Sequence, residues 1–220
     1  MLWEQDEEAP LSEQRPEAVE LFFPLRGDRL QGDYRLALAT ALEPLLSACG
    51  ADPARVGVRL THLPASGNGW YRERGAVIHL SRRVSLALRV ARDAANGLGG
   101  LAGAQICLGD TSLRLGPARV EELPAVEPLY APYVLGLTET EDEAAFEAAL
   151  QQRLQVMDIV PRRLLCGRTE PVQTPAGVRL ARSVLVDGMG VEAGLRLQAR
   201  GVGEGRQWGC GLFLPHKAVL

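Results

Sequence analysis

Near its C-terminus, the sequence gathers residue types that suit the binding of an anion. Five of the eleven residues from Gly201 to Gly211 are glycine, and Arg206 and Trp208 lie among them. Glycine allows positive φ angles and lets a ligand come close to the backbone. An arginine there can reach a phosphate, and a tryptophan can stack on a base. The segment predicts a loop for a bulky, anionic ligand; the alternatives are a solvated arginine and a tryptophan that covers the core edge.

A second candidate site is the start of the first predicted helix. Asp33 stands where an N-cap residue is expected, and Tyr34 follows it. The N–H groups and the dipole at a helix N-terminus favour a phosphate, and the alternative is a surface tyrosine that packs on the next turn. The ordinary pKa of a tyrosine is about 10, which makes it a poor base at pH 7 but lets it donate or position a proton.

The charge is distributed in blocks of alternating sign. The net charge is −6 over residues 1–20, +6 over 21–120, −8 over 121–159 and +5 over 160–220. Of the 24 basic residues only Lys217 is a lysine. Arginine binds phosphates in a fork and stacks on bases, so this composition favours RNA as the partner. A GC-rich genome, which also replaces lysine with arginine, is the alternative explanation.

The histidines offer fewer possibilities for acid–base chemistry. His62 ends an alternating segment over residues 55–63, so it is either a catalytic residue or a partly buried residue at a strand end. His79 alternates with apolar neighbours and is expected in the core or in a hairpin. His216 and Lys217 lie beyond the last predicted strand, where residues are usually solvated and can also contact a nucleic acid.

Length and composition describe an ordinary globular chain. Its 220 residues, 46% of them hydrophobic, suffice for one large domain or two small ones. The sequence has no apolar segment of about 18 residues, and its acidic start does not resemble a signal peptide. The four widely spaced cysteines are expected to be small buried residues rather than disulfide or metal partners. We therefore expect a cytoplasmic location and no membrane contact.

The hydrophobic patterns predict an α+β fold with two tandem ferredoxin-like (RRM-like) units. An acidic, flexible segment (1–18) should precede a unit over 19–122 and a second unit over 130–220 that carries the glycine-rich loop. The first unit is expected to contain strands at 18–27, 55–63 and 111–116, a helix from Tyr34, two strands around Ser81–Arg83, and a weakly helical stretch at 93–104. The second should contain, after a linker at 120–132, strands at 133–137, 162–167, 178–186 and 210–215, with helices at 140–157 and 191–200. Thr140 and Glu143 are expected to form a capping box.

The loop "GVGEGRQWGCGLFLP" (201–215) resembles the signature loop of the CRISPR repeat-cleaving endoribonucleases, the sixth Cas protein family. That signature has glycine–apolar–glycine, a spacer with a basic residue, and glycine–any–glycine before an apolar strand. Gly201, Gly203, Arg206, Gly209 and Gly211 match those places. The opening "LFFPLRGDRLQGDYRLALATAL" (21–42) and "LRLQARGVG" (195–203) are also similar, so the resemblance covers residues 19 to 215.

The resemblance implies an activity. The family cuts the repeat of a CRISPR precursor transcript on the 3′ side of a hairpin, without a metal or other cofactor. The ribose 2′-OH attacks the adjacent phosphorus and leaves a 2′,3′-cyclic phosphate; this chemistry needs a base, an acid and a cation. Many members use a histidine at the first helix, whereas this chain has Tyr34 there and no histidine before His62.

These arguments give a list of expected site residues. The expected catalytic residues are Tyr34, Arg206 and His62. The residues expected to bind RNA are Arg26, Arg29, Arg35, Arg82, Arg83, Arg200, Gly203, Gly205, Trp208 and Lys217, the Arg82–Arg83 pair at a hairpin tip. The expected partners are the repeat hairpin and other subunits of a CRISPR effector complex.

Two other functions remain possible from the sequence. Because the first helix lacks a histidine, the chain can instead be a repeat-RNA-binding subunit with little or no cleavage. A ferredoxin-like protein-interaction domain without RNA is the third alternative, which the loop and the charge blocks argue against.

Overall fold

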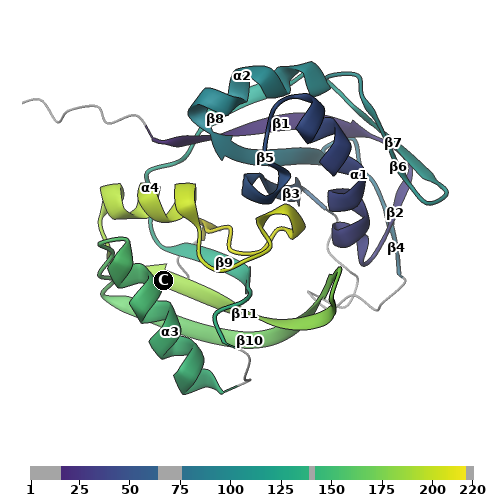
Figure 1. Ribbon diagram of the computed structural model, residues 1–220. Helices are drawn as coiled ribbons and strands as arrows, with labels where there is room; N and C mark the ends of the chain where they lie inside the picture. The colour runs from purple at the N-terminus through teal and green to yellow at the C-terminus, as the bar shows by residue number, and fades with distance from the viewer. Residues whose placement is uncertain (1–15, 64–75, 139–141, 217–220) are drawn as a thin grey trace, which may run out of the picture.

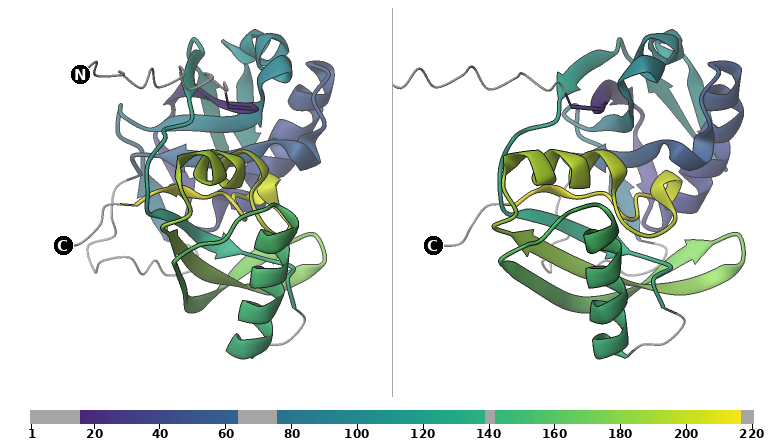
Figure 2. Two further views of the ribbon diagram at one scale, coloured as in Figure 1. Left: turned by 90° about the vertical axis from the view of Figure 1, so that its left-hand side faces the viewer. Right: turned by 60° about the vertical axis from the view of Figure 1, so that its left-hand side comes forward.

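The computed structural model describes residues 16–63, 76–138 and 142–216. They form an α+β fold with two large antiparallel sheets, one in each half of the chain, and a small two-stranded sheet in the first half (Figure 1). Helix α4 and the glycine-rich loop, which belong to the second half, lie between the two sheets (Figures 1 and 2). Among the described residues, no helix is long and apolar enough to cross a membrane.

The first sheet has the strand order β3-β5-β1-β7-β6, with β8 also paired to β1. Its strands are β1 (Ala18–Arg26), β3 (Gly57–Thr61), β5 (Ser85–Ala91), β6 (Gln105–Leu108), β7 (Thr111–Leu115) and β8 (Arg119–Glu122). Helix α1 (Tyr34–Ala48) and the short α2 (Ala95–Leu98), which lies between two 3₁₀ turns, cover one face. Alternate residues of β1, namely Val19, Leu21 and Phe23, point into this core because successive strand side chains face opposite sides.

A separate ribbon lies beside the first sheet. Strands β2 (Arg29–Gln31) and β4 (Val77–His79) pair only with each other. The prediction that Arg82 and Arg83 sit at a hairpin tip is therefore wrong, because the strands on either side of this exposed turn belong to different sheets. His79 is exposed rather than in the core, since only Ile78 of β4 faces inward.

The second sheet has the order β10-β11-β9-β12. Its strands are β9 (Leu129–Val134), β10 (Arg163–Thr174), β11 (Gly177–Asp187) and β12 (Leu214–Pro215). Helices α3 (Glu143–Val156) and α4 (Val191–Arg200) supply Phe146, Leu150 and Leu197 to a core of their own. The glycine-rich loop follows α4 and contains the 3₁₀ turn η4 (Arg206–Trp208).

Several predicted boundaries in the second half are wrong. Strand β9 begins at Leu129, inside the expected linker, and its pairing with β11 is irregular around Pro132, which has no N–H to donate. The N-cap of α3 is Asp142, whose carboxylate accepts from the Ala144 N–H, so the capping box does not form; Thr140 lies outside the described residues. The last strand is only two residues long because Gly211 takes a φ of 67°.

The N-terminal boundary and the cysteines also differ from expectation. Pro16 and Glu17, assigned to a flexible segment, are bound in place: the Arg92 side chain donates to the Pro16 carbonyl, and the Arg92 N–H donates to the Glu17 carbonyl. All four cysteines are free, but only Cys210 is buried, and Cys107 is exposed.

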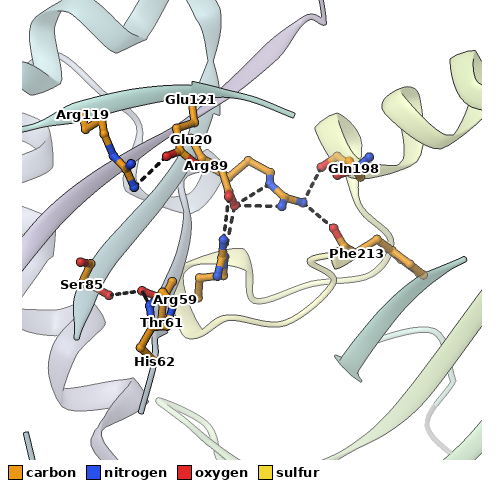
Figure 3. Close-up of polar contacts among 10 residues, drawn as sticks. All are labelled: Glu20, Arg59, Thr61, His62, Ser85, Arg89, Arg119, Glu121, Gln198 and Phe213. Atoms are coloured by element: carbon orange, nitrogen blue, oxygen red, sulfur yellow. Dashed lines mark hydrogen bonds and ion pairs between the residues drawn. The ribbon is translucent and has the colours of Figure 1, made fainter. Parts of the chain in front are cut away.

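The two halves are joined through a buried arginine, which is paired with a carboxylate of its own half. Glu20 on β1 and Arg89 on β5 are cross-strand partners on the sheet face away from α1, and Arg89 is 1% exposed. The Arg89 Nη2 donates to Glu20 Oε1 at 2.8 Å, and its Nη1 donates to the carbonyls of Gln198 (3.0 Å) and Phe213 (2.8 Å), both in the second half (Figure 3). One side chain of the first half thus satisfies backbone acceptors of the second.

A glycine on β3 lets the second half approach closely. A Cβ atom at Gly57 would lie 2.6 Å from the Leu212 Cδ2 atom and 3.2 Å from the Arg89 Cβ atom. The buried Leu212 side chain therefore occupies the space that any larger residue at position 57 would fill. Because Gly57 has no side chain, Leu212 fits beside it, and this contact fixes where the C-terminal segment lies against the first sheet.

The buried carboxylate is held in its ionised form. Burial by itself would raise the pKa of Glu20, but the Arg89 and Arg59 guanidinium groups lower it, and the net pKa is below the ordinary value. The stabilisation from this carboxylate is therefore present above its unfolded-state pKa and is lost as the pH falls through the lower folded-state pKa.

We predict that Arg89→Ala lowers the free energy of unfolding by about 3–5 kcal/mol, because it leaves buried carbonyls and part of a buried carboxylate without donors. Urea unfolding followed by circular dichroism measures the change. Arg153→Ala on the exposed side of α3 is the matched control and should change stability by less than about 0.5 kcal/mol. A loss below about 1 kcal/mol for Arg89→Ala would show that this arginine does not hold the halves together.

Candidate active site

The glycine-rich loop packs tightly on the rest of the protein. Gly201, Gly203 and Gly211 all have positive φ, and a Cβ atom at each would lie 2.2–2.3 Å from a backbone carbonyl oxygen. These oxygens belong to Gly211, Leu135 and Val202, in that order. The glycines are therefore required by the close approach of the protein's own backbone, and the space beside these three is already filled.

Arg206 organises this loop. Its guanidinium donates to the carbonyl oxygens of Arg200 and, at 3.0 Å, Ala199, at the C-terminal end of α4. A cation there satisfies carbonyls that have no partner within the helix and complements the helix dipole. Burial, with a smaller effect from Arg89, lowers the pKa of Arg206 to about 10, so it stays charged at neutral pH. The expected role of Arg206 in charge stabilisation stays a prediction, while its observed role is to cap α4.

A cavity of about 130 Å³ separates the loop from the start of α1. It brings together Tyr34 and Arg35 of α1, Arg59 of β3, Tyr133 of β9 and Trp208 of the loop. Its other lining residues are Leu38, Val58, Leu60, Pro132, Gln207, Gly209, Leu212 and Leu214. The loop and the first helix start thus face each other across the two halves.

The cavity is cationic. Arg35 and Arg59 line it, and none of the described lining residues is acidic. The Arg35 guanidinium lies 3.8 Å from the centre of the Tyr133 ring, which holds it by a cation–π interaction. Trp208 packs against a small buried cluster that includes Cys210, so it covers a core edge and also presents a face to the cavity.

Tyr34 also lines a second cavity, of about 490 Å³. Asp33 and Asp110 line this space, and no arginine or lysine of the described chain does so. Asp33 stands at the N-cap position but makes no capping hydrogen bond through its side chain, which corrects the expectation. Tyr34 therefore lies between one cavity that two arginines line and another that two aspartates line.

His62 is not part of the cavity. It follows the last residue of β3, has a positive φ of 55°, and is exposed. Its Nδ1 atom lies 3.2 Å from the Thr61 hydroxyl oxygen (Figure 3). The alternative that His62 is a partly buried residue of the strand end is wrong, because β3 ends at Thr61 and His62 is exposed in the turn that follows.

The other predicted RNA-binding residues do not line the cavity. Arg26 at the end of β1 faces Arg114 across the sheet, Arg29 is paired with Asp110 at 2.9 Å, and Arg200 is paired with Glu17 at 3.4 Å. The two ion pairs, Arg29–Asp110 and Arg200–Glu17, are largely exposed and contribute little to stability. The exposed turn carries Arg82 and Arg83; the loop carries Gly203, which is exposed, and Gly205, and Lys217 lies outside the described residues.

Sequence reasoning missed Arg59 and Tyr133. On β3, Arg59 lies between Val58 and Leu60 and therefore points to the opposite face of the strand. A charged residue on that face was the signal that the sequence offered for Arg59. Tyr133 was expected at the start of a strand rather than near the end of one. In the described ranges, no group of three or more histidine, cysteine or acidic residues could hold a metal ion.

The cavity between the loop and the first helix start agrees with the family resemblance. Comparison of the sequence with known families decides whether the chain belongs to that family. A model of the family described as Cas6 Crispr matches residues 19–218. The chain belongs to the Cas6 family of CRISPR-associated endonucleases. The CRISPR-associated endonuclease Cas6 of Myxococcus xanthus strain DK1622 is 30% identical to it over 206 residues, which cover 90% of this chain and 81% of that protein.

Solved structures show the same fold at low identity. A CRISPR-associated Cas6 protein superposes with a TM-score of 0.63 at 12% identity, over 91% of this chain and all of that one. A protein described as a RAMP protein that binds different RNA substrates gives 0.62 at 11% identity, over 89% and 98% of the two chains. The product of a Cas6-related gene of Pyrococcus furiosus gives 0.56 at 14%, over 89% and 97%.

We predict that Gly203→Ala destabilises this Cas6 protein much more than Gly103→Ala does. Both glycines have a φ near 85°, but a Cβ atom at Gly203 would meet the Leu135 carbonyl oxygen at 2.2 Å, whereas nothing lies within 4 Å at Gly103. The backbone strain, about 1–2 kcal/mol, is common to both variants. Thermal unfolding should show a decrease in Tm for Gly203→Ala that is at least twice the decrease for the control Gly103→Ala. Equal losses would mean that the loop does not need the close contact.

Proposed function

We propose that this Cas6 protein is an endoribonuclease that cuts CRISPR precursor RNA at its repeat hairpin to give guide RNA. The observation that carries the proposal is the cavity between the α1 start and the glycine-rich loop, where Arg35 and Arg59 meet Tyr34 without an acidic neighbour in the lining. Such a site suits one phosphodiester of an RNA strand. Membership in a family of endonucleases supports the same activity.

The proposed reaction is an internal transesterification. The ribose O2′ attacks the adjacent phosphorus, the O2′–P bond forms, and the P–O5′ bond breaks. O2′ loses its proton and O5′ gains one, so the products are a 2′,3′-cyclic phosphate and a free 5′-hydroxyl. Because the nucleophile is part of the substrate, the reaction requires in-line positioning, charge stabilisation on the phosphorane and proton transfer, without a metal ion.

The lining residues suggest how these tasks are divided. The two arginines stabilise the additional negative charge of the phosphorane. The Tyr34 phenol donates its proton to O5′ or positions it for protonation. No described histidine lines the cavity, so we propose that the O2′ proton passes to solvent and that positioning provides much of the rate.

The substrate hairpin would extend from this site over the arginine-rich surface of the first half. Arg26, Arg29, Arg82 and Arg83 are exposed there and are proposed to bind its phosphates. We propose that the protein stays on the hairpin of its product, as a subunit of an effector complex.

We further propose that each half is a ferredoxin-like unit, over residues 19–122 and 130–220. The strand orders β3-β5-β1-β7 and β10-β11-β9-β12 support this, because both place the first strand of the unit between the third and the fourth. The two helices of each half contribute to a common core, which also supports it.

A second candidate function is an RNA-binding subunit with little or no cleavage. The observation that favours it is again the absence of histidine from the described lining of the cavity. Both functions need the same surface, so activity alone separates them.

We predict that the purified protein cuts the repeat RNA of its own locus in EDTA and leaves a 2′,3′-cyclic phosphate. Denaturing gels and treatment of the 3′ end with a phosphatase that spares cyclic phosphates measure both points. A repeat with a 2′-deoxyribose at the cleaved position is the control and should bind without being cut. Binding of the natural repeat without cleavage would select the second function.

We predict that Tyr34→Phe lowers the single-turnover rate about tenfold to a hundredfold with RNA affinity retained, since it removes only a hydroxyl. His62→Ala should leave the rate within about twofold. The rate of the wild type should rise with pH between 6 and 8 without the inflection that a histidine base gives. If His62→Ala abolishes cleavage while Tyr34→Phe has no effect, the histidine does the chemistry and the assignment of Tyr34 is wrong.

A further inference from the structure

Arg59 is held in place by the Glu20 carboxylate, which also binds Arg89. Its Nη2 donates to Glu20 Oε2 at 2.6 Å and its Nε donates to Glu20 Oε1 at 3.1 Å, which is a two-point contact (Figure 3). Arg89 approaches Glu20 from the other side, through Nη2 at 2.8 Å and Nε at 3.1 Å, both to Oε1. Such forked contacts fix the plane of a guanidinium as well as its position.

The group carries more positive than negative charge. Two arginines share one carboxylate, and neither Arg59 nor Arg89 is paired with another acidic residue in the described chain. Arg206, whose lowered pKa owes part of its shift to Arg89, adds another cation nearby. Burial of unbalanced charge is costly, and a bound anion would offset that cost.

Arg59 lines the cavity and keeps one donor nitrogen that Glu20 does not occupy. Nε and Nη2 donate to Glu20, whereas Nη1 makes no hydrogen bond to the described residues. The Arg59 side chain is 22% exposed, and it lines the cavity together with Tyr34 and Arg35. Arg89, at 1% exposed, cannot reach a ligand itself. Its hydrogen bonds to the Gln198 and Phe213 carbonyls instead fix the group relative to α4 and the last strand.

We infer that Arg59 binds the phosphate at the cleavage site and is a catalytic residue, with Glu20 and Arg89 as its positioning residues. This inference rests on the proposed function and assigns the principal cation of that site. It also makes phosphate binding depend on the contact between the two halves, because Arg89 binds Glu20 in the first half and two carbonyls of the second. The arginine is preorganised, so it stabilises the phosphorane without first losing side-chain freedom.

The first test compares single-turnover cleavage by Arg59→Ala and by Arg153→Ala, which removes an exposed arginine remote from the described machinery. Arg59→Ala should lower the rate at saturating protein by about a hundredfold or more, with less than a tenfold change in the Kd for the repeat RNA. Arg153→Ala should match the wild type in both. A rate for Arg59→Ala within threefold of the wild type would overturn the inference.

Chemical rescue and a mutant cycle test the positioning role of Glu20. Added guanidinium ion at millimolar concentration should raise the cleavage rate of Arg59→Ala at least tenfold, because the carboxylate that would hold the ion remains. The same addition should not raise the rate of the double variant that also carries Glu20→Gln. In the Arg59→Ala background, Glu20→Gln should lower the rate by less than threefold. If guanidinium does not rescue Arg59→Ala and the two substitutions lower the cleavage rate additively, Glu20 acts only on the fold. If Glu20→Gln fails to fold, rescue of Arg59→Ala alone decides whether a guanidinium at this place is catalytic.

A binding experiment separates this inference from the proposed function. Titration with inorganic phosphate, followed by calorimetry or by the rise in Tm, needs no cleavage. The wild type and Arg153→Ala should bind phosphate equally, and Arg59→Ala should bind at least tenfold more weakly. If the wild type cuts no repeat RNA, the proposed function fails, while this difference still supports Arg59 as the phosphate ligand. Equal phosphate binding by Arg59→Ala and the wild type would overturn the assignment, even in an active enzyme.

Discussion

The contact between Arg89 and Glu20 is the interaction on which the arrangement of this protein depends. A guanidinium at 1% exposure is stable only when its donors are satisfied, and here the acceptors come from both halves of the chain. Removing the second half would leave Arg89 with unused donors, and removing the first would leave two buried carbonyls without partners. Each half therefore supplies partners to buried polar groups of the other, and residues of both halves line the cavity between them.

The glycine-rich loop illustrates how a flexible composition gives a fixed structure. Each glycine lowers the stability of the folded state through the entropy of the unfolded chain. In return, the backbone turns at positive φ and runs along β3, where a Cβ atom at Gly209 would lie 3.0 Å from the Val58 carbonyl oxygen. The loop brings Trp208 and Gln207 to the cavity wall as a rigid support. Its glycines let segments of the protein's own backbone pack closely together. The cationic groups of the cavity come from α1 and β3 instead.

The sequence supported the order of the elements well and the site only in part. Periodic apolar residues located β1, α1 and α4 almost to the residue, because burial of one face decides such segments. The strand with Pro132 and the short last strand were misplaced, since their ends are set by tertiary contacts. Tyr34, Arg35 and Trp208 were found because local motifs surround them. Arg59 was missed because its importance comes from Glu20 and Arg89, which lie 39 and 30 residues away and become neighbours only through strand pairing.

The glycine at position 57 has a consequence for how the two halves diverge in evolution. Since the end of the Leu212 side chain fills the space beside it, a larger residue at position 57 requires that side chain to move or to be replaced by a smaller one. Residues 57 and 212, which lie 155 positions apart, are therefore coupled, and a hybrid that joins one half to that of a distant relative brings two unmatched side chains together at this contact.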